Sequence, residues 1–107
     1  MEFADIIRFQ KSWSERTFGK GKRTSGIVKH IKSELDEILQ ADNDTDRLGE
    51  CIDVIILAMD MAWRLGFTAD EIEQALIDKQ VRNQKRKWPS VEISEASQDE
   101  PTYHVKE

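Results

Sequence analysis

Four acidic side chains, arranged as two pairs, are the residues of this 107-residue sequence whose types and spacing best suit chemistry. The pairs are Glu34 with Glu37 and Glu50 with Asp53. Residues at positions i and i+3 project from the same face of a helix, so two consecutive antiparallel helices would gather these carboxylates around one point. Two carboxylates about 4 Å apart repel by about 4 kcal/mol at an effective dielectric near 20. Protonation relieves this repulsion, and so does a hard divalent cation; we favour the cation, Mg²⁺ or Mn²⁺.

The sequence around the two pairs supports a metal site over a solvated acidic surface. Asp53 leads directly into residues 54–63, the most apolar run of the chain, and a solvated pair would not need such a neighbour. A stripe of donors continues the apolar face of the last long helix through Lys79, Asn83 and Arg86. This stripe indicates either a pocket lined by these side chains or cations that simply favour the C-terminal end of a helix dipole.

Helical periodicity predicts the elements that position the acids, and nothing in the sequence predicts a strand. The third helix is apolar nearly all round from Cys51 to Trp63, so we expect it to be central, with Cys51 a small buried hydrophobe. Asp60 interrupts this run and needs a cationic partner such as Arg86. The predicted fold class is therefore all-α, with four main helices in an antiparallel bundle. The first predicted helix spans about residues 3–16, and the third spans about 45–65. The second begins at a cap, Thr24 or Ser25, and ends at about residue 40. The fourth begins at a capping box, Thr68–Glu71, and ends at Trp88.

Length and composition indicate one domain over residues 1–89, followed by a polar acidic tail over 90–107. The net charge of −5 argues against a nucleic-acid partner. A single cysteine excludes an internal disulfide framework. No signal peptide and no apolar segment of about 20 residues is present, which predicts a cytoplasmic protein without a membrane partner. One chain leaves the third helix short of cover, so we expect a homo-oligomer.

The residues around the acid pairs carry a family resemblance. Together they resemble the all-α nucleoside triphosphate pyrophosphohydrolases, the MazG-like superfamily, and within it the dATP/dGTP diphosphohydrolase branch, near bacteriophage enzymes of the MazZ type. The resemblance covers about residues 9–89. Beside the two acid pairs, it rests on Trp13–Gly19, His30-x-x-x-Glu34, residues 53–60, Ala62-Trp-Arg-x-Gly66 and Lys79-x-x-x-Asn83-x-x-Arg86-x-Trp88-Pro89.

The resemblance implies a reaction in which water converts a deoxynucleoside triphosphate, dGTP or dATP, into the monophosphate and pyrophosphate. Bound Mg²⁺, with Mn²⁺ as a substitute, would lower the pKa of the water that attacks the α-phosphorus. One acid, Glu37 by preference or else Glu34, takes the proton of this water. By the same resemblance the metal ligands are Glu34, Glu37, Glu50 and Asp53. The corresponding phosphate-binding positions are Lys79, Asn83 and Arg86.

Four further residues are candidates with alternatives left open. Trp13 stacks on the base or packs in the core, and His30 orients the acid one turn later, contacts the base or is a surface histidine. Lys22 and Arg23 reach phosphate from a glycine-rich loop or are solvated. The resemblance also implies a homodimer or homotetramer, in the host cytoplasm if the chain is phage-encoded. The rival functions are a pyrimidine dUTP/dCTP or house-cleaning pyrophosphatase, and a non-catalytic helical interaction module.

Overall fold

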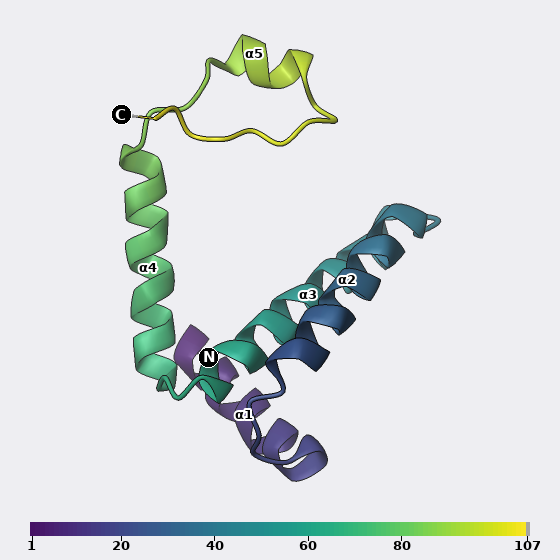
Figure 1. The fold of residues 1–107 in the computed structure, drawn as a ribbon, viewed down its shortest axis with the longest axis vertical. Coiled ribbons are helices and arrows are strands. Elements are labelled where there is room, and N and C mark those ends of the chain that lie inside the picture. Colours follow the sequence, from purple (N-terminus) through teal and green to yellow (C-terminus); the bar gives the residue numbers. More distant parts are fainter. Residues whose placement is uncertain (107) are drawn as a thin grey trace. The chain divides into compact units, whose positions relative to one another are not determined.

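The computed structural model describes residues 1–106, and helices are the only regular elements in this part of the chain (Figure 1). The predicted all-α fold class is confirmed, whereas the four-helix antiparallel bundle and the oligomer stay predictions. No helix within residues 1–106 is long and apolar enough to cross a membrane. The five helices are α1 (Phe3–Phe18), α2 (Thr24–Gln40), α3 (Asp44–Arg64), α4 (Ala69–Lys85) and α5 (Val91–Ala96).

The chain forms two compact units, Met1–Glu73 and Gln74–Glu107, so the division falls within α4. The second unit contains a short helix, α5, in the segment predicted as a polar tail. The Ser90 side chain caps α5 by accepting a hydrogen bond of 3.4 Å from the backbone N–H of Ile93. Past α5, the N–H of Val105 donates to the carbonyl of Lys87 at 2.7 Å, which closes this segment on itself. The domain boundary expected after residue 89 stays a prediction.

The ends of the long helices follow local chemistry, with one exception. The capping box at Thr68–Glu71 is confirmed: the Thr68 N–H donates to Glu71 Oε1 at 3.0 Å, and the Glu71 N–H donates to Thr68 Oγ1 at 3.1 Å. Gly66, with a φ of 104°, ends α3 in the left-handed region. The cap expected at Thr24 or Ser25 is wrong. Helix α2 begins at Thr24 after Arg23, which makes no side-chain capping bond.

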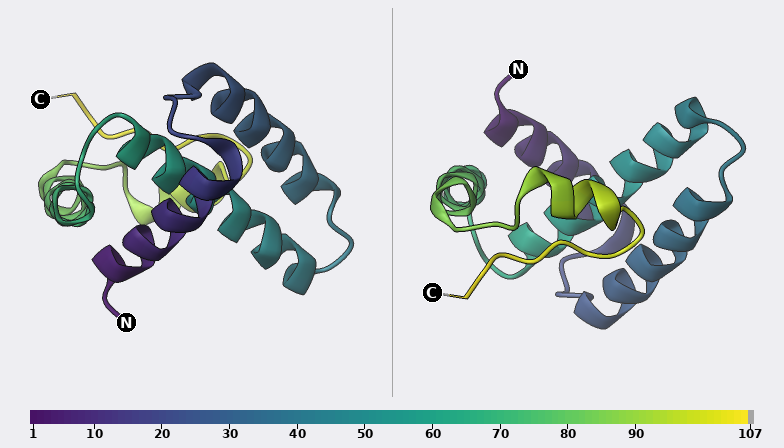
Figure 2. Two further views of the ribbon diagram at one scale, coloured as in Figure 1. Left: turned by 90° about the horizontal axis from the view of Figure 1, so that it is seen from below. Right: turned by 90° about the horizontal axis from the view of Figure 1, so that it is seen from above.

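Helices α2 and α3 lie side by side as an antiparallel hairpin, and α1 packs against α3 (Figures 1 and 2). The short connection 41–43 allows this return, and the Asn43 side chain caps α3 by accepting from the Asp46 N–H at 2.9 Å. The buried core joins α1 to the C-terminal half of α3 through Ile7, Met59 and Trp63. Burying a side chain as large as Ile7 completely is worth about 1.5–3 kcal/mol.

The N-terminal half of α3 has a different environment, because within this unit only α2 covers it. Leu48 is 61% exposed and Ile55 is 49% exposed. Cys51 is exposed as well, so the expectation that it is a buried hydrophobe is wrong for the single chain. The third helix is therefore central at its C-terminal end and uncovered on one side of its N-terminal end.

Candidate active site

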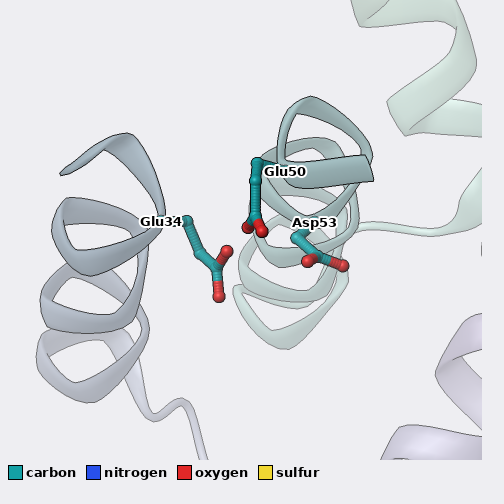
Figure 3. Close-up of side chains that lie close together, drawn as sticks. All are labelled: Glu34, Glu50 and Asp53. Carbon is teal, nitrogen blue, oxygen red and sulfur yellow. The ribbon is translucent and has the colours of Figure 1, made fainter. Parts of the chain in front are cut away.

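Three of the four predicted acids converge between α2 and α3. Glu34 of α2 points toward α3, where Glu50 and Asp53 project one turn apart (Figure 3). One carboxylate oxygen from each of the three lies within 4.8 Å of the others. The convergence follows from the hairpin, since the acidic face of each helix meets the other helix. We call Glu34, Glu50 and Asp53 the acid cluster.

Glu37 lies beside the acid cluster rather than within it. Its side chain is exposed, and among the described residues it does not belong to the group of mutually close oxygens. It does line an open cavity of about 570 Å³ together with Glu50 and Asp53. Glu37 therefore shares solvent space with the cluster and acts on it through hydrogen bonding and charge.

Hydrogen bonds, burial and neighbouring charges together raise the pKa of two of these carboxyl groups. A hydrogen bond to Glu34, burial and the charge of Glu37 raise the pKa of Glu50 to about 7. For Glu34, a hydrogen bond with Glu50 lowers the pKa, but a hydrogen bond with Glu37, burial and the charges of Glu37 and Asp53 outweigh it, so the pKa is raised. Without a cation, the cluster thus holds a proton at a pH where free carboxyl groups are ionised.

The donor set of the cluster fits a hard cation. Glu34 is buried, and its Oε2 atom has no hydrogen-bond partner in the described chain, while its Oε1 lies 3.1 Å from His30 Nε2. A buried carboxylate oxygen without a partner is unfavourable by several kcal/mol unless a charge compensates it. Carboxylate oxygens are the ligands that Mg²⁺ and Mn²⁺ prefer. The acid cluster is thus able to bind a metal ion.

A cavity of about 400 Å³ opens beside the acid cluster and shares Glu34 and Asp53 with it. Helices α1, α2 and α3 all contribute to its wall, so it lies wholly within the first unit. Three residues expected to contact substrate line this cavity with the acids: Trp13, Arg23 and His30. Lys22 is exposed and does not belong to the wall, so its role stays a prediction.

Aromatic and cationic groups line the part of this cavity near the C-terminal end of α1. Trp13 is 49% exposed, which argues against the core-packing alternative in the single chain. Its ring meets the ring of Phe18 edge-on at 5.5 Å. The guanidinium of Arg23 lies 4.8 Å from the centre of the Phe18 ring. The wall of the cavity therefore combines carboxylates with exposed rings and a cation.

Comparison with known proteins decides the family. A family model described as dATP/dGTP pyrophosphohydrolase matches residues 6–107. The chain belongs to the dATP/dGTP pyrophosphohydrolase family. It is accordingly a nucleoside triphosphate pyrophosphohydrolase, which argues against the non-catalytic interaction module. No curated protein and no solved structure matched the chain. The resemblance drawn from residues 9–89 is confirmed, and the match also includes the C-terminal segment.

Asp60 also lines the cavity of this pyrophosphohydrolase, and neighbouring donors hold its carboxylate. Gln10 Nε2 donates to Asp60 Oδ1 at 2.9 Å, and Arg64 Nε donates to Oδ2 at 2.7 Å. Burial would raise the pKa of Asp60, but hydrogen bonds from Ser14, Gln10 and Arg64 outweigh it, so the pKa is lowered. We expected a cation such as Arg86; the observed cation is Arg64, which follows Asp60 by one helical turn.

Sequence reasoning missed Arg64 although a signal was present. An acid and a base four positions apart lie on the same face of a helix and pair readily. Asp60 and Arg64 have this spacing at the end of an apolar run, where each needs a partner of opposite charge. Ser14, which is 1% exposed and contacts Arg64, gave no comparable signal because its contact spans 50 positions.

The predicted phosphate-binding residues of the last long helix belong to the second unit. Asn83 Oδ1 accepts a hydrogen bond of 3.2 Å from Arg86 Nη1, and Lys79 is exposed. Arg86 also lines a basic cavity of about 370 Å³ within this unit. Their role as phosphate ligands stays a prediction. The other residues of that basic cavity are Arg82, Lys85 and His104.

Proposed function

We propose that this pyrophosphohydrolase converts the purine deoxynucleoside triphosphates dGTP and dATP into the monophosphate and pyrophosphate in a Mg²⁺-dependent reaction. A water oxygen bonds to the α-phosphorus, the bond from that phosphorus to the α,β-bridging oxygen breaks, and pyrophosphate leaves. The observation that carries the proposal is the acid cluster beside a cavity, in a chain of the dATP/dGTP pyrophosphohydrolase family.

The residues proposed to hold the cation are Glu34, Glu50 and Asp53, with Mn²⁺ as an alternative to Mg²⁺. The unpartnered Oε2 of buried Glu34 and the raised pKa of Glu50 support this role, since both mark surplus negative charge. When bound, the metal neutralises triphosphate charge and makes water more acidic. His30, 3.1 Å from Glu34 Oε1, would keep the buried carboxylate oriented.

Glu37 is the proposed acceptor of the water proton, with Glu34 as the second choice. Its position supports this division of labour, because Glu37 faces the open cavity shared with Glu50 and Asp53 but stands outside the cluster. A carboxylate that binds no cation keeps its lone pairs for a proton. A positioned general base contributes about 10²–10⁴-fold to the rate of such a step.

The nucleoside is proposed to occupy the cavity of about 400 Å³, which falls in the size range of small-molecule sites. With the α-phosphate near Glu34 and Asp53, the base would extend toward Trp13 and Phe18. Half-exposed aromatic rings suit a purine, which stacks well on flat surfaces. Arg23 and Lys22 are the proposed phosphate ligands near this cavity; for Lys79, Asn83 and Arg86 the proposal of phosphate binding rests on the family resemblance alone.

The proposal extends to a homodimer or homotetramer, which the uncovered face of the hairpin supports. A contiguous apolar surface on a folded unit often marks an interface. Sedimentation or light scattering at several protein concentrations measures the assembly directly, and a monomer throughout would contradict this part of the proposal. The exposed apolar residues of α2 and α3 include Leu35, Leu39, Leu48, Ile52 and Ile55.

Pyrophosphate release from a panel of dGTP, dATP, dUTP and dCTP with Mg²⁺ tests the proposed activity. We expect faster release from the two purines, and loss of release in Glu50→Gln. Asp36→Asn is the matched control, because Asp36 lies on α2 between Glu34 and Glu37, is exposed and stands outside the acid cluster. Equal rates on dUTP and dGTP would contradict the purine preference and favour a pyrimidine or house-cleaning enzyme.

A further inference from the structure

Arg64 is the most completely enclosed charged side chain of the first unit, and three of its four hydrogen bonds connect α3 to other segments of that unit. Its side chain is 0% exposed. Nε donates to Asp60 at 2.7 Å, and Nη2 donates to the hydroxyl of Ser14 at 2.9 Å. Nη1 donates to two backbone carbonyls, those of Gly19 at 2.8 Å and Gly21 at 2.7 Å.

Burial of a guanidinium is unfavourable by several kcal/mol unless its donors are all satisfied. Hydrophobic packing alone would not require such a group at this position, so its bonds indicate a specific task. Two of the four acceptors belong to the connection between α1 and α2, which we call the 19–23 loop. This loop is exposed along its whole length. Within residues 1–106, Arg64 is the one side chain that hydrogen-bonds its backbone.

The backbone conformation of the 19–23 loop requires stabilisation by contacts from outside the loop. Gly19 has a φ of 85°, and Gly21 has open space around it, so the loop backbone has little intrinsic rigidity. Arg23 has a φ of 53°, a left-handed conformation that is unfavourable for a residue with a side chain. Such a conformation persists where surrounding contacts impose it. The bonds from Arg64 are contacts of this kind.

Arg23 is also the cation of the cavity beside the acid cluster, where its guanidinium lies over Phe18. We infer that Arg64 is a positioning residue: by fixing the carbonyls of Gly19 and Gly21 to α3, it holds Arg23 at the cavity wall for contact with the nucleotide. The inference rests on the proposed function in so far as the cavity takes the nucleotide. A purely structural role predicts instead that Arg64 acts on the stability of the unit alone.

A double-mutant cycle between Arg64 and Arg23 distinguishes the two roles. Arg64→Lys keeps the charge but loses the planar fork that reaches several acceptors at once. We expect it to raise KM for dGTP about tenfold, with kcat within about twofold, which corresponds to the loss of one charge-assisted contact. In an Arg23→Gln background the same substitution should raise KM by less than about twofold, because the group it positions is gone.

Arg16→Lys is the matched control, since Arg16 is exposed on α1 and bonds only Ser12 among the described residues. It should leave KM unchanged. If Arg64→Lys raises KM by the same factor with and without Arg23, or lowers only the melting temperature, the positioning role is wrong.

A measurement on the wild-type chain without nucleotide keeps the inference testable if Arg64→Lys fails to fold. Backbone ¹⁵N relaxation of residues 19–23 should give order parameters near 0.85, as for rigid backbone, whereas values below about 0.6 would overturn the anchoring role. Failure of the proposed function is separate and recognisable: the wild type would hydrolyse no nucleotide of the panel, whatever the loop does.

Discussion

Substitution of Glu50 by Gln should raise the stability of the metal-free protein and reduce the stabilisation that Mg²⁺ provides. In the metal-free protein, a hydrogen bond to Glu34, burial and the charge of Glu37 raise the pKa of Glu50 from 4.5 to about 7. Between these values the folded state binds more protons than the unfolded state, so stability falls as the pH rises from about 4.5 to about 7. Glu50→Gln removes this penalty. At pH 8 the metal-free variant should therefore melt at a higher temperature than the wild type.

Mg²⁺ should stabilise the wild type more than the variant, and the linkage relation gives the magnitude of this difference. Free Mg²⁺ at 100 times its Kd stabilises the wild type by about 2.7 kcal/mol. If loss of one oxygen ligand weakens binding by about 10- to 100-fold, the same Mg²⁺ concentration stabilises Glu50→Gln by only about 0.4–1.4 kcal/mol. Because a domain of about 100 residues gains about 4–8 °C per kcal/mol, the difference is readily measured.

Thermal unfolding at pH 8, with EDTA or with Mg²⁺, measures both halves of this prediction. Asp36→Asn removes one negative charge from α2 outside the acid cluster, and it should respond to Mg²⁺ like the wild type. If Glu50→Gln is less stable than the wild type in EDTA, the ionised Glu50 carboxylate does not destabilise the metal-free protein as described. If it gains as much from Mg²⁺ as the wild type, Glu50 does not bind the ion.

Three further substitutions test separate parts of the site. Glu37→Gln should lower kcat by at least about 100-fold while Mg²⁺ affinity by calorimetry stays within about threefold; a matching loss of affinity would make Glu37 a ligand instead. Trp13→Ala should raise KM for dGTP about tenfold with little change in melting temperature, since the ring is half exposed; unchanged KM would remove Trp13 from base binding. Asp60→Asn should destabilise the protein by about 2 kcal/mol near neutral pH by leaving Arg64 without its carboxylate. Because the pKa of Asp60 is lowered, this difference should vanish as the pH falls below 3.8; urea unfolding that shows the same difference at low pH would contradict the pairing.

The acid cluster was predictable because helical geometry is local. Glu34, Glu50 and Asp53 converge because the i,i+3 spacing and one short turn suffice to define two facing surfaces. The capping box at Thr68–Glu71 is local in the same sense, and it is confirmed. Contacts between residues that lie within one or two helical turns of each other can be derived from the sequence with few assumptions.

Contacts between distant segments were not predictable in the same way. Arg64 bonds Gly19 and Gly21 across more than 40 positions, and the sequence contains no periodicity that pairs a side chain with a loop carbonyl. The exposure of Cys51 was not predicted, because the sequence of an apolar helix does not show which of its faces a neighbouring helix covers. The left-handed Arg23, in place of a cap at Thr24 or Ser25, depends on those distant contacts too.

Hydrolysis of dGTP in ¹⁸O-labelled water, with Mg²⁺ or with EDTA, tests the central claim most directly. The acid cluster is proposed to serve attack of water on the α-phosphorus, so mass spectrometry should find the label in dGMP and none in pyrophosphate, and only when Mg²⁺ is present. Label in pyrophosphate, or equal turnover in EDTA, would contradict the proposed reaction and the metal-binding role of Glu34, Glu50 and Asp53.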